Sequence, residues 1–315
     1  MRIILTDCEK YCPVNDFKSL YRDVFFVKAG YSLKDTINRI GGGKSIIAVV
    51  GSRALVKSVQ SSLNDFPNLK FIQLSSTGFD DISPSLFQSS NILISNAPGV
   101  YDETVAEYAV YMMLKYAKRY HSSLKNTNWR PFRNYHYMTE LKGKTVGIMG
   151  VGNIGSRIAC LLCGFEMRVI GFAKTTRSKL HFEFIYHKDG LNTFLEQCDF
   201  IINALPDNED SKGLLNKDRF SIMKDSVVFI NVGRETVYVK EDLVNFFLNN
   251  KNAVGILDIF ELIPKFFDKF HRLHNIYITP RISAYSKESD NRLRKLVKEN
   301  LLLFLSGKKP NYQLG

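Results

Sequence analysis

The sequence of 315 residues contains no long uninterrupted apolar run, whereas a membrane-spanning helix needs roughly 18–20 such residues. Its first short apolar stretch already ends at Asp7, so we do not expect a secretory signal peptide there. We therefore expect a strand at the N-terminus and a soluble, cytoplasmic protein that has no membrane partner.

Cysteine is scarce, and the five that occur are Cys8, Cys12, Cys160, Cys163 and Cys198. An odd number without a secretory signal excludes a disulfide scaffold and indicates a reducing compartment. Cys160 and Cys163 have the CxxC spacing, but no second pair or histidine cluster accompanies them. We expect these two thiols to pack within a helix rather than to bind zinc, and we expect no metal.

The composition is that of a globular protein, with 45% hydrophobic and 23% charged residues, and the length predicts two domains. The net charge is +12, and residues 264–315 carry much of it, with 11 Lys and Arg against 4 Asp and Glu. No DNA-reading motif or interleaved aromatic pattern accompanies this excess. We therefore predict a solvated helix face and no nucleic-acid partner.

Short apolar runs alternate with stretches of helical periodicity along the chain, which predicts parallel sheets covered by helices on both faces. The expected strands are 3–5, 46–50, 71–74, 92–94, 144–149, 168–172, 200–204, 227–231, 254–257 and 276–278. The expected helices are 32–40, 54–63, one that begins at 102, one that follows 150, and 287–305. The last of these could belong to either domain, and 121–140 is expected to be a loop.

A glycine-rich turn, Gly150-Val-Gly152-Asn-Ile-Gly155, follows an expected strand and opens a helix. In that context the spacing is typical of a dinucleotide-binding turn. Gly150 permits the tight turn, Gly152 lets the backbone approach a pyrophosphate, and Gly155 allows close helix–strand packing. We therefore predict that the helix N-terminus, at Asn153 and Ile154, binds the anionic pyrophosphate.

The end of the next strand distinguishes NAD from NADP. An NAD site normally has Asp or Glu there, which accepts a hydrogen bond from the ribose 2′-hydroxyl. In this sequence Ala173 stands at that place, and Lys174, Thr175, Thr176 and Arg177 follow. The missing carboxylate removes repulsion against a 2′-phosphate, and a cation can pair with it. We therefore predict that NADP(H) is preferred over NAD(H).

Further motifs occur along nearly the whole chain. They are Ser76-Thr77-Gly78-Phe79-Asp80-Asp81-Ile82, Asn96-Ala-Pro-Gly99, Thr104-Val-Ala-Glu107, Leu141-Lys-Gly-Lys-Thr-Val-Gly-Ile-Met-Gly150, Leu205-Pro206, Ile230-Asn-Val-Gly-Arg234, Leu257-Asp258-Ile-Phe-Glu261 and Thr279-Pro280. With these motifs the sequence resembles the D-isomer-specific 2-hydroxyacid dehydrogenases, the family of glyoxylate/hydroxypyruvate reductases and phosphoglycerate dehydrogenases.

The resemblance implies an α/β fold of two doubly wound parallel-sheet domains. A Rossmann cofactor domain, 97–284, would be inserted into a flavodoxin-like substrate-binding domain made of 1–96 and 285–315, with the active site in the cleft. Family members are usually dimers joined through the cofactor domain. We therefore expect a homodimer in which the loop 121–140 wraps the partner.

The resemblance also implies roles for individual residues. Thr77 and Gly78 would bind the carboxylate of a 2-oxo or 2-hydroxy acid through backbone N–H groups. Arg234 would orient this substrate and stabilise its developing negative charge. The residues that would line the cofactor, besides the glycine-rich turn, are Thr104, Leu205, Pro206, Val232, Gly233, Arg234 and Asp258, with Asp258 near the carboxamide.

Two positions depart from the family pattern. The family places a catalytic His after Thr-Pro, but this sequence has Arg281 there, and Ile263 occupies the place of the paired Glu. Arginine has a pKa above ~12 and stays protonated, so it is a poor general acid. Glu235 also replaces the Gly that follows the key arginine. We expect Arg281 to belong to a catalytic site whose proton transfer is altered.

Three interpretations follow from this departure. Another group, such as His271, His274, Tyr285, Lys287 or water, delivers the proton. Alternatively, Arg281 adds a second cation, so that the cleft suits a more anionic substrate and turns it over slowly, or it pairs structurally with a nearby acid such as Glu235 or Glu261. In the third, the protein binds a dinucleotide and reports on it to a partner without turnover.

We predict an NADP(H)-preferring 2-oxoacid reductase, or D-2-hydroxyacid dehydrogenase, and keep the dinucleotide sensor as the alternative. General acid–base help contributes about 10²–10⁴-fold to a rate, so its loss weakens catalysis without abolishing hydride transfer.

Overall fold

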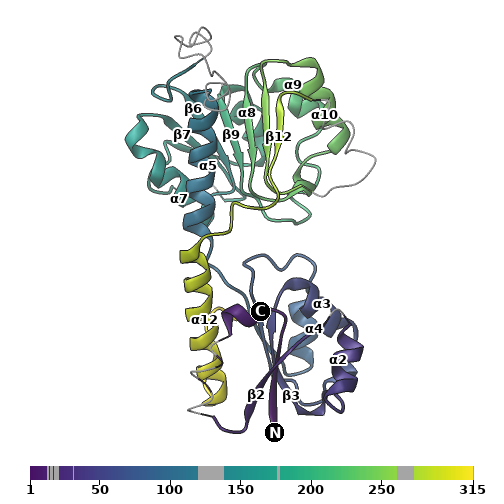
Figure 1. Ribbon diagram of the computed structural model, residues 1–315. Coiled ribbons are helices and arrows are strands. Elements are labelled where there is room, and N and C mark those ends of the chain that lie inside the picture. The colour runs from purple at the N-terminus through teal and green to yellow at the C-terminus, as the bar shows by residue number, and fades with distance from the viewer. Residues whose placement is uncertain are drawn as a thin grey trace, which may run out of the picture. The chain divides into compact units, whose positions relative to one another are not determined.

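The computed structural model describes residues 1–12, 14, 17, 21–30, 32–119, 138–175, 178–260 and 273–314. The chain forms two compact units, one made of Met1–Tyr101 and Tyr285–Gly315 and the other of Asp102–Ala284 (Figure 1). Each unit contains one parallel sheet with helices on both faces, which confirms the predicted α/β fold. Within the described ranges, no helix combines the length and the apolar character that crossing a bilayer requires.

The sheet of the first unit has five parallel strands in the order β2-β1-β3-β4-β5. They are β1 (Arg2–Thr6), β2 (Val24–Lys28), β3 (Ile46–Gly51), β4 (Phe71–Leu74) and β5 (Leu93–Ser95). The central strands are buried on both sides, which explains their nearly continuous apolar sequences. The order of the strands reverses between β1 and β3, and such a switch point opens a crevice at the carboxyl ends of the strands.

Helices cover both faces of this sheet (Figure 1). One face carries α2 (Leu33–Arg39), α3 (Arg53–Ser61) and α4 (Pro84–Ser89), and the other carries α12 (Lys287–Leu305). Leu293, Val297 and Leu301 of α12 are buried in one cluster with Ile4 and Phe71 of the sheet. The last helix therefore belongs to the first unit, which settles the point that its sequence left open.

The C-terminal tail of the chain returns to β5. The backbone N–H of Leu314 donates to the carbonyl of Ile94 over 2.9 Å, and Asn96 donates to the carbonyl of Tyr312 over 3.3 Å. The first unit is thus built from both ends of the chain.

The sheet of the second unit has seven parallel strands in the order β12-β11-β10-β9-β6-β7-β8. They are β6 (Thr145–Met149), β7 (Arg168–Phe172), β8 (Phe184–Tyr186), β9 (Phe200–Asn203), β10 (Val228–Asn231), β11 (Val254–Leu257) and β12 (Ile276–Ile278). The order reverses between β6 and β9, so the crevice lies at the carboxyl ends of these strands, where the glycine-rich turn begins.

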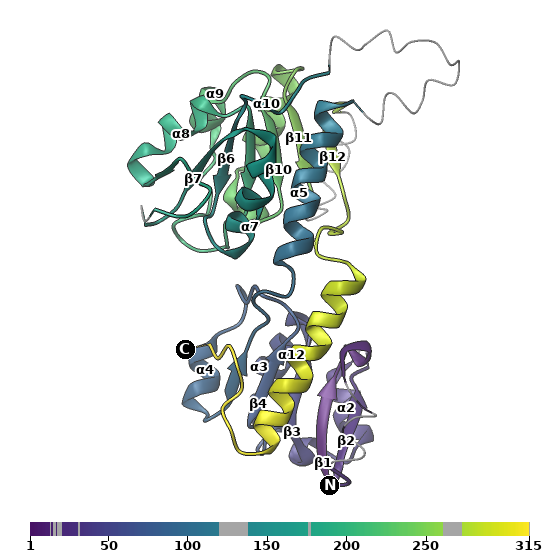
Figure 2. The same cartoon turned by 90° about the vertical axis from the view of Figure 1, so that its left-hand side faces the viewer.

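Helices lie on both faces of this second sheet as well (Figure 2). One face carries α5 (Asp102–Ala117) and α7 (Asn153–Leu162), and the other carries α8 (Leu191–Gln197), α9 (Lys217–Ile222) and α10 (Lys240–Asn249). Phe194, Phe220 and Phe247 of the latter three helices share a buried cluster with Ile201 and Phe229 of the strands. Short 3-10 helices occupy Glu9–Tyr11, Gly43–Ser45, Leu63–Asp65, Cys163–Phe165, Lys188–Gly190 and Glu235–Val237.

Candidate active site

The glycine-rich turn joins β6 to α7 in a conformation that requires its glycines. Gly150 has φ +97°, a left-handed conformation that side chains with a Cβ rarely adopt. A Cβ at Gly155 would lie 1.9 Å from the carbonyl oxygen of Gly150, so this glycine lets the helix begin directly against the turn. A Cβ at Gly152 would meet no protein atom within 4 Å, so the space beside it is open.

The helix that follows presents its amino end without a protein cap. α7 begins at Asn153, and its capping residue, Gly152, has no side chain that could accept a hydrogen bond from the first turn. The unsatisfied N–H groups of a first turn and the helix dipole together attract an anion. The residues present therefore fit the pyrophosphate of a dinucleotide.

The end of β7 bears no carboxylate in its described part. Ala173 is half-buried there, and Lys174 and Thr175 are exposed. The ammonium of Lys174 forms an ion pair with Asp210 over 3.0 Å, and its hydrogen bond holds the pKa of that carboxyl below its usual value. Thr176 and Arg177, which we also predicted to bind the cofactor, lie outside the described residues.

The structure adds a cation that sequence reasoning missed. The ammonium of Lys179 donates hydrogen bonds to the carbonyl of Val151, in the glycine-rich turn, and to Ser156 Oγ over 3.4 Å. The residue follows the cationic run at 174–177, but only the folded chain shows which segment its side chain reaches.

Two buried asparagines fix the loops that leave β9 and β10. Asn203 Nδ2 donates to Asn231 Oδ1 over 2.8 Å and to the carbonyl of Arg234 over 3.2 Å. Asn203 Oδ1 accepts from the N–H of Leu205 at 3.1 Å, and Asn231 Oδ1 accepts from the N–H of Gly233 at 3.2 Å. The predicted cofactor-lining residues of these two loops are thereby held side by side.

The loop after β9 also holds Pro206. Its carbonyl accepts a hydrogen bond from Ser211 Oγ over 2.6 Å. The loop after β10 contains Val232, which is buried and whose N–H donates to the carbonyl of Asn203 over 3.0 Å. Both loops lie at the carboxyl edge of the sheet, the same edge as the glycine-rich turn.

Arg234 directly follows this asparagine network and is half-buried. Its Nη1 donates to the carbonyl of Gly233 over 3.2 Å. The neighbouring Glu235, which stands where the family has Gly, forms an ion pair with Lys240 over 3.3 Å. The carboxylate of Glu235 therefore has a cation of its own.

Asp258 anchors the loop that carries Arg281. Its side chain is only 1% exposed. One carboxylate oxygen accepts from Thr279 Oγ1 at 2.6 Å and from the N–H of Ile282 at 2.9 Å, and the other accepts from the N–H of Ser283 at 3.1 Å. The hydroxyl of Tyr108 lies 2.6 Å from Thr279 Oγ1, and burial raises the pKa of Tyr108 to about 12.

Thr104 adds a second tie to this loop. Its hydroxyl donates to the carbonyl of Ser283 over 3.1 Å. Thr104 lies in the first turn of α5, so the long helix and the loop after β12 are linked at the same point.

Arg281 lies in that loop with an unusual backbone. Its φ is +55°, and its N–H donates to the carbonyls of Asp258 and Thr279 over 3.1 and 2.9 Å. The side chain is exposed, and the structure records no ion-pair partner for its guanidinium among the residues that it describes. His274 is exposed before β12, at the opposite end of that strand. Ile263, Glu261 and His271 lie outside the described residues.

Thr77 and Gly78 belong to the first unit and follow β4. The hydroxyl of Thr77 donates to the carbonyl of Ala97 over 2.8 Å, and its carbonyl accepts from Asn96 Nδ2 at 2.7 Å. The carbonyl of Gly78 accepts from Ser76 Oγ at 2.8 Å. In the described part of the chain, the N–H groups of Thr77 and Gly78 have no hydrogen-bond acceptor.

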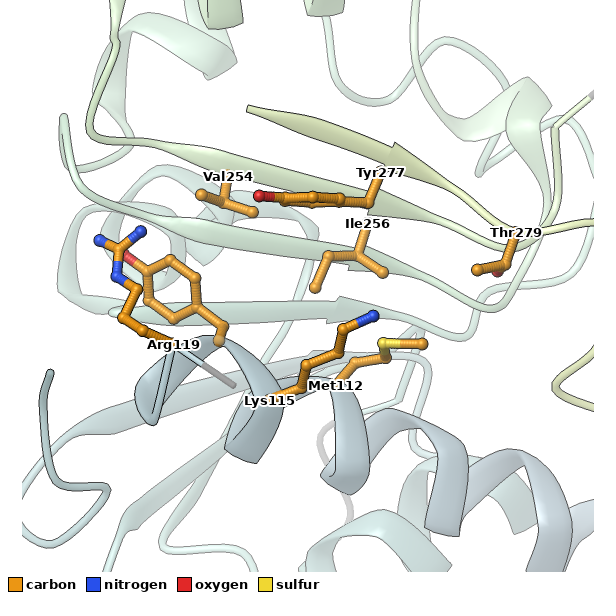
Figure 3. A pocket seen from close by; sticks show the side chains of 8 residues that line it. Met112, Lys115, Arg119, Val254, Ile256, Tyr277 and Thr279 are labelled. Atoms are coloured by element: carbon orange, nitrogen blue, oxygen red, sulfur yellow. The ribbon is translucent and has the colours of Figure 1, made fainter. Parts of the chain in front are cut away.

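A pocket of the second unit lies apart from the glycine-rich turn, between α5 and the strands β11 and β12 (Figure 3). It holds about 510 Å³ of empty space, its open mouth included. Its lining residues are Met112, Lys115, Tyr116, Arg119, Val254, Ile256, Tyr277 and Thr279. Thr279 alone connects this pocket to the loop that Asp258 anchors.

The expected packing of the CxxC pair is wrong for Cys163. Cys160 is half-buried in α7, but Cys163 is exposed, and its sulfur lies 3.0 Å from His181 Nδ1. The helix ends at Leu162, so Cys163 falls just past the buried face that the pattern assigned to it.

Comparison with known proteins places this geometry in a family. Residues 108–283 match the family model of the D-isomer specific 2-hydroxyacid dehydrogenase, NAD binding domain. The glyoxylate reductase of Pyrococcus furiosus is 28% identical over 263 residues, which cover 80% of this chain and 77% of that protein. The glyoxylate reductase of Thermofilum pendens is 30% identical over 257 residues, covering 78% and 74%.

A solved structure agrees with these matches at the level of the fold. The acyclic imino acid reductase Bsp5, in complex with NADPH and D-Arg, superimposes with a TM-score of 0.85 at 22% identity, and the alignment covers 100% of both chains. The comparisons thus favour an enzyme over a dinucleotide sensor without turnover. The chain belongs to the D-isomer-specific 2-hydroxyacid dehydrogenase family and transfers a hydride between a nicotinamide dinucleotide and a 2-oxo or D-2-hydroxy acid.

Proposed function

We propose that this enzyme is a reductase of a small 2-oxo acid that prefers NADPH and works with an altered proton-transfer site. The observation that carries the cofactor preference is the end of β7, where Ala173 stands in place of an acidic residue and cations follow. A carboxylate there would favour the ribose 2′-hydroxyl of NAD, whereas its absence favours a 2′-phosphate. Thr175, Thr176 and Arg177 complete the proposed phosphate site.

The second unit serves as the cofactor domain in this proposal. The open space beside Gly152 and the uncapped start of α7 would hold the pyrophosphate. The loops with Leu205, Pro206, Val232 and Gly233 would line the rest of the groove, together with Thr104 and Asp258. When bound, the reduced nicotinamide supplies the hydride.

The first unit serves as the substrate domain, and its N–H groups at Thr77 and Gly78 would bind the substrate carboxylate. Arg234 would orient the carbonyl and stabilise the negative charge that develops on its oxygen, a role that suits a planar guanidinium. The exposed guanidinium of Arg281 would add a second positive charge at the position where the family has a proton donor.

Water is the proton source in this proposal. The guanidinium of Arg281 holds its proton too tightly to be a general acid. His274 is a poor candidate, because it precedes β12 whereas Arg281 follows that strand. We therefore expect Arg281 to stabilise the alkoxide electrostatically while solvent protonates it, at the cost of a lower rate than a histidine would give.

The direct test is NADPH oxidation with glyoxylate, hydroxypyruvate, pyruvate and phenylpyruvate. Dissociation constants for NADPH and NADH are measured alongside by the quenching of protein fluorescence. We expect turnover of at least one 2-oxo acid and tighter binding of NADPH. Tighter binding of NADH would overturn the cofactor assignment, and cofactor binding without turnover of any acid would favour the dinucleotide sensor.

A second candidate substrate follows from the missing proton donor at position 281. A 2-imino acid accepts hydride as its iminium, which already carries the proton that a 2-oxo acid must receive from the enzyme. Bsp5, with the same fold, is named an acyclic imino acid reductase. Addition of methylamine to each 2-oxo acid would accelerate NADPH oxidation if the iminium is the true substrate. No acceleration by the amine would leave 2-oxo acids as the substrates.

We further propose a cytoplasmic homodimer formed through the second unit. Large apolar side chains are exposed on α5 and β12, with Tyr111 at 50%, Tyr277 at 45% and Ile278 at 37%, and Tyr277 lines the pocket of Figure 3. Exposed aromatic side chains of this kind are enriched at protein interfaces. Analytical ultracentrifugation tests the dimer, and a monomer at micromolar concentration would contradict it.

A further inference from the structure

Lys179 holds a positive charge against the glycine-rich turn. Its ammonium donates to the carbonyl of Val151, in that turn, and to Ser156 Oγ, in the first turn of α7. Both acceptors are neutral, and within the described ranges no carboxylate lies at ion-pair distance from this ammonium. The charge is therefore fixed in place but not neutralised.

The turn at Val151 packs against the end of β7. The N–H of Gly150 donates to the carbonyl of Phe172 over 2.8 Å, and a Cβ at Gly171 would lie 2.8 Å from Val151 Cγ2. In a dinucleotide site, the ribose of the adenosine lies between the glycine-rich turn and the end of this strand. The ammonium of Lys179 is thus held on the side of the turn where the ribose 2′-position would lie.

The donor count favours an anion as the third partner. An ammonium has three N–H donors, and Lys179 uses two of them on Val151 and Ser156. The third can reach a phosphate oxygen without breaking either bond. A donor that is already held in position loses little conformational entropy when the ligand binds.

Lys174 differs from Lys179 in its partner. Both lysines are exposed, but the ammonium of Lys174 forms an ion pair with Asp210 over 3.0 Å. A 2′-phosphate would have to compete with that carboxylate for Lys174, but it meets no such competitor at Lys179.

Building on the NADP preference proposed above, we propose that Lys179 is a specificity-determining residue that binds the 2′-phosphate of NADP(H). It lies in the segment after the cationic run at 174–177, and its hydrogen bonds to Val151 and Ser156 fix the position of its ammonium.

The test compares K179M, K179R and the wild type in titrations with NADPH, NADH, 2′,5′-ADP and 5′-AMP. K251M is the matched control, because Lys251 is exposed before β11, at the opposite edge of the sheet, and its loss changes the net charge equally. Charged hydrogen bonds contribute enough to change affinity by about tenfold or more. Thermal melting of each variant verifies that it folds.

We expect K179M to raise the dissociation constants of NADPH and 2′,5′-ADP about tenfold or more. Those of NADH and 5′-AMP should change less than about twofold. K179R should retain much of the affinity, and K251M should bind like the wild type. An equal loss of affinity for all four ligands in K179M would overturn the proposal, because Lys179 would then only hold the turn. Unchanged affinity for all four ligands would overturn it as well.

The wild type separates this inference from the cofactor preference. If the wild type binds NADH more tightly than NADPH, the proposed NADP preference fails, and the comparison of 2′,5′-ADP with 5′-AMP still tests Lys179. If the wild type prefers NADPH but K179M keeps that preference unchanged, the preference stands and the role of Lys179 is refuted.

Discussion

The hydroxyl of Thr279 donates to the buried carboxylate of Asp258 over 2.6 Å and lies 2.6 Å from the hydroxyl of Tyr108. One side chain thus links α5, the end of β11 and the loop that carries Arg281. The family motif places Thr and Asp in separate segments, and the structure shows that they form one hydrogen-bonded unit.

Replacement of this threonine by its isostere should therefore loosen the loop. We expect T279V to lower the free energy of unfolding by about 1–2 kcal/mol, because Asp258 loses a donor and Tyr108 loses its partner. Urea denaturation measures the change. T193V is the control, since Thr193 is exposed on α8, and its effect should stay within about 0.5 kcal/mol. Equal effects of the two substitutions would contradict the linking role of Thr279.

Two glycines of the same turn should respond differently to alanine. G155A places a methyl group 1.9 Å from the carbonyl oxygen of Gly150, so we expect a strongly destabilised protein. G152A meets no protein atom within 4 Å, so it should fold normally and lose at least about tenfold in dinucleotide affinity. Thermal melting and cofactor titration measure these two effects. Normal cofactor binding by G152A would show that the pyrophosphate lies elsewhere.

Restoring the family's proton relay should raise the reductive rate. We expect the double variant R281H/I263E to increase kcat by about 10-fold or more, because general acid help is typically worth about 10²–10⁴-fold. R281H alone should gain less, since its imidazole lacks the paired carboxylate. Steady-state kinetics with the preferred 2-oxo acid gives the rates. A double variant that folds, binds cofactor and gains nothing would show that these two positions are not the relay.

Arg234 should be needed for chemistry more than for cofactor binding. We expect R234K to lower kcat/KM by about 10²-fold or more, because lysine lacks the planar fork that holds a carboxylate or alkoxide through two donors. Its dissociation constant for NADPH should change less than about threefold. Stopped-flow kinetics and cofactor titration separate the two quantities. A variant that loses cofactor affinity as strongly as kcat/KM would move Arg234 to the cofactor site.

The thiols should differ sharply in reactivity. Burial raises the pKa of Cys198 to about 12, so at pH 8 its thiol is almost entirely protonated, whereas the reactive form is the thiolate. Cys163 is exposed. We expect a disulfide reagent to modify Cys163 first in the native protein, and C163S to remove that fast phase. Cys198 should react only when urea unfolds the chain, and its rapid reaction in the native protein would contradict this burial.

Because the pKa of Cys198 is raised in the folded state, the free energy of unfolding should fall as the pH rises. The folded state favours the protonated thiol, so the contribution of Cys198 to the free energy of unfolding is complete below pH 9. It is lost as the pH rises through about 12.

The sequence was sufficient to predict the buried strands and two of the four edge strands, β5 and β12, but not the other two. β1, β3 and β4 are apolar at nearly every position because they are covered on both faces. β2 and β8 escaped prediction, and both lie at the edges of their sheets, where Phe25 and Phe184 remain 49% and 55% exposed.

In the candidate site, the sequence predicts the local turn but not the hydrogen bonds between distant segments. The turn at Gly150 is encoded locally, so its residues were predicted from the glycine spacing between an expected strand and an expected helix. The bonds between Asn203 and Asn231, and between Lys179 and Val151, join segments that are 28 residues apart in the chain. No local signal reveals which of many exposed lysines will reach the turn, since that depends on how the intervening strand and loop fold.

The burial of Leu293, Val297 and Leu301 of α12 against the first sheet has a consequence for biosynthesis. This helix leaves the ribosome after the whole second unit, so the sheet of the first unit waits, with one apolar face uncovered, until residues 287–305 have been made. The second unit is continuous in the chain and can fold while it is still being made. Nascent chains arrested before residue 290 should therefore expose that uncovered face to chaperones, although their second unit has already formed.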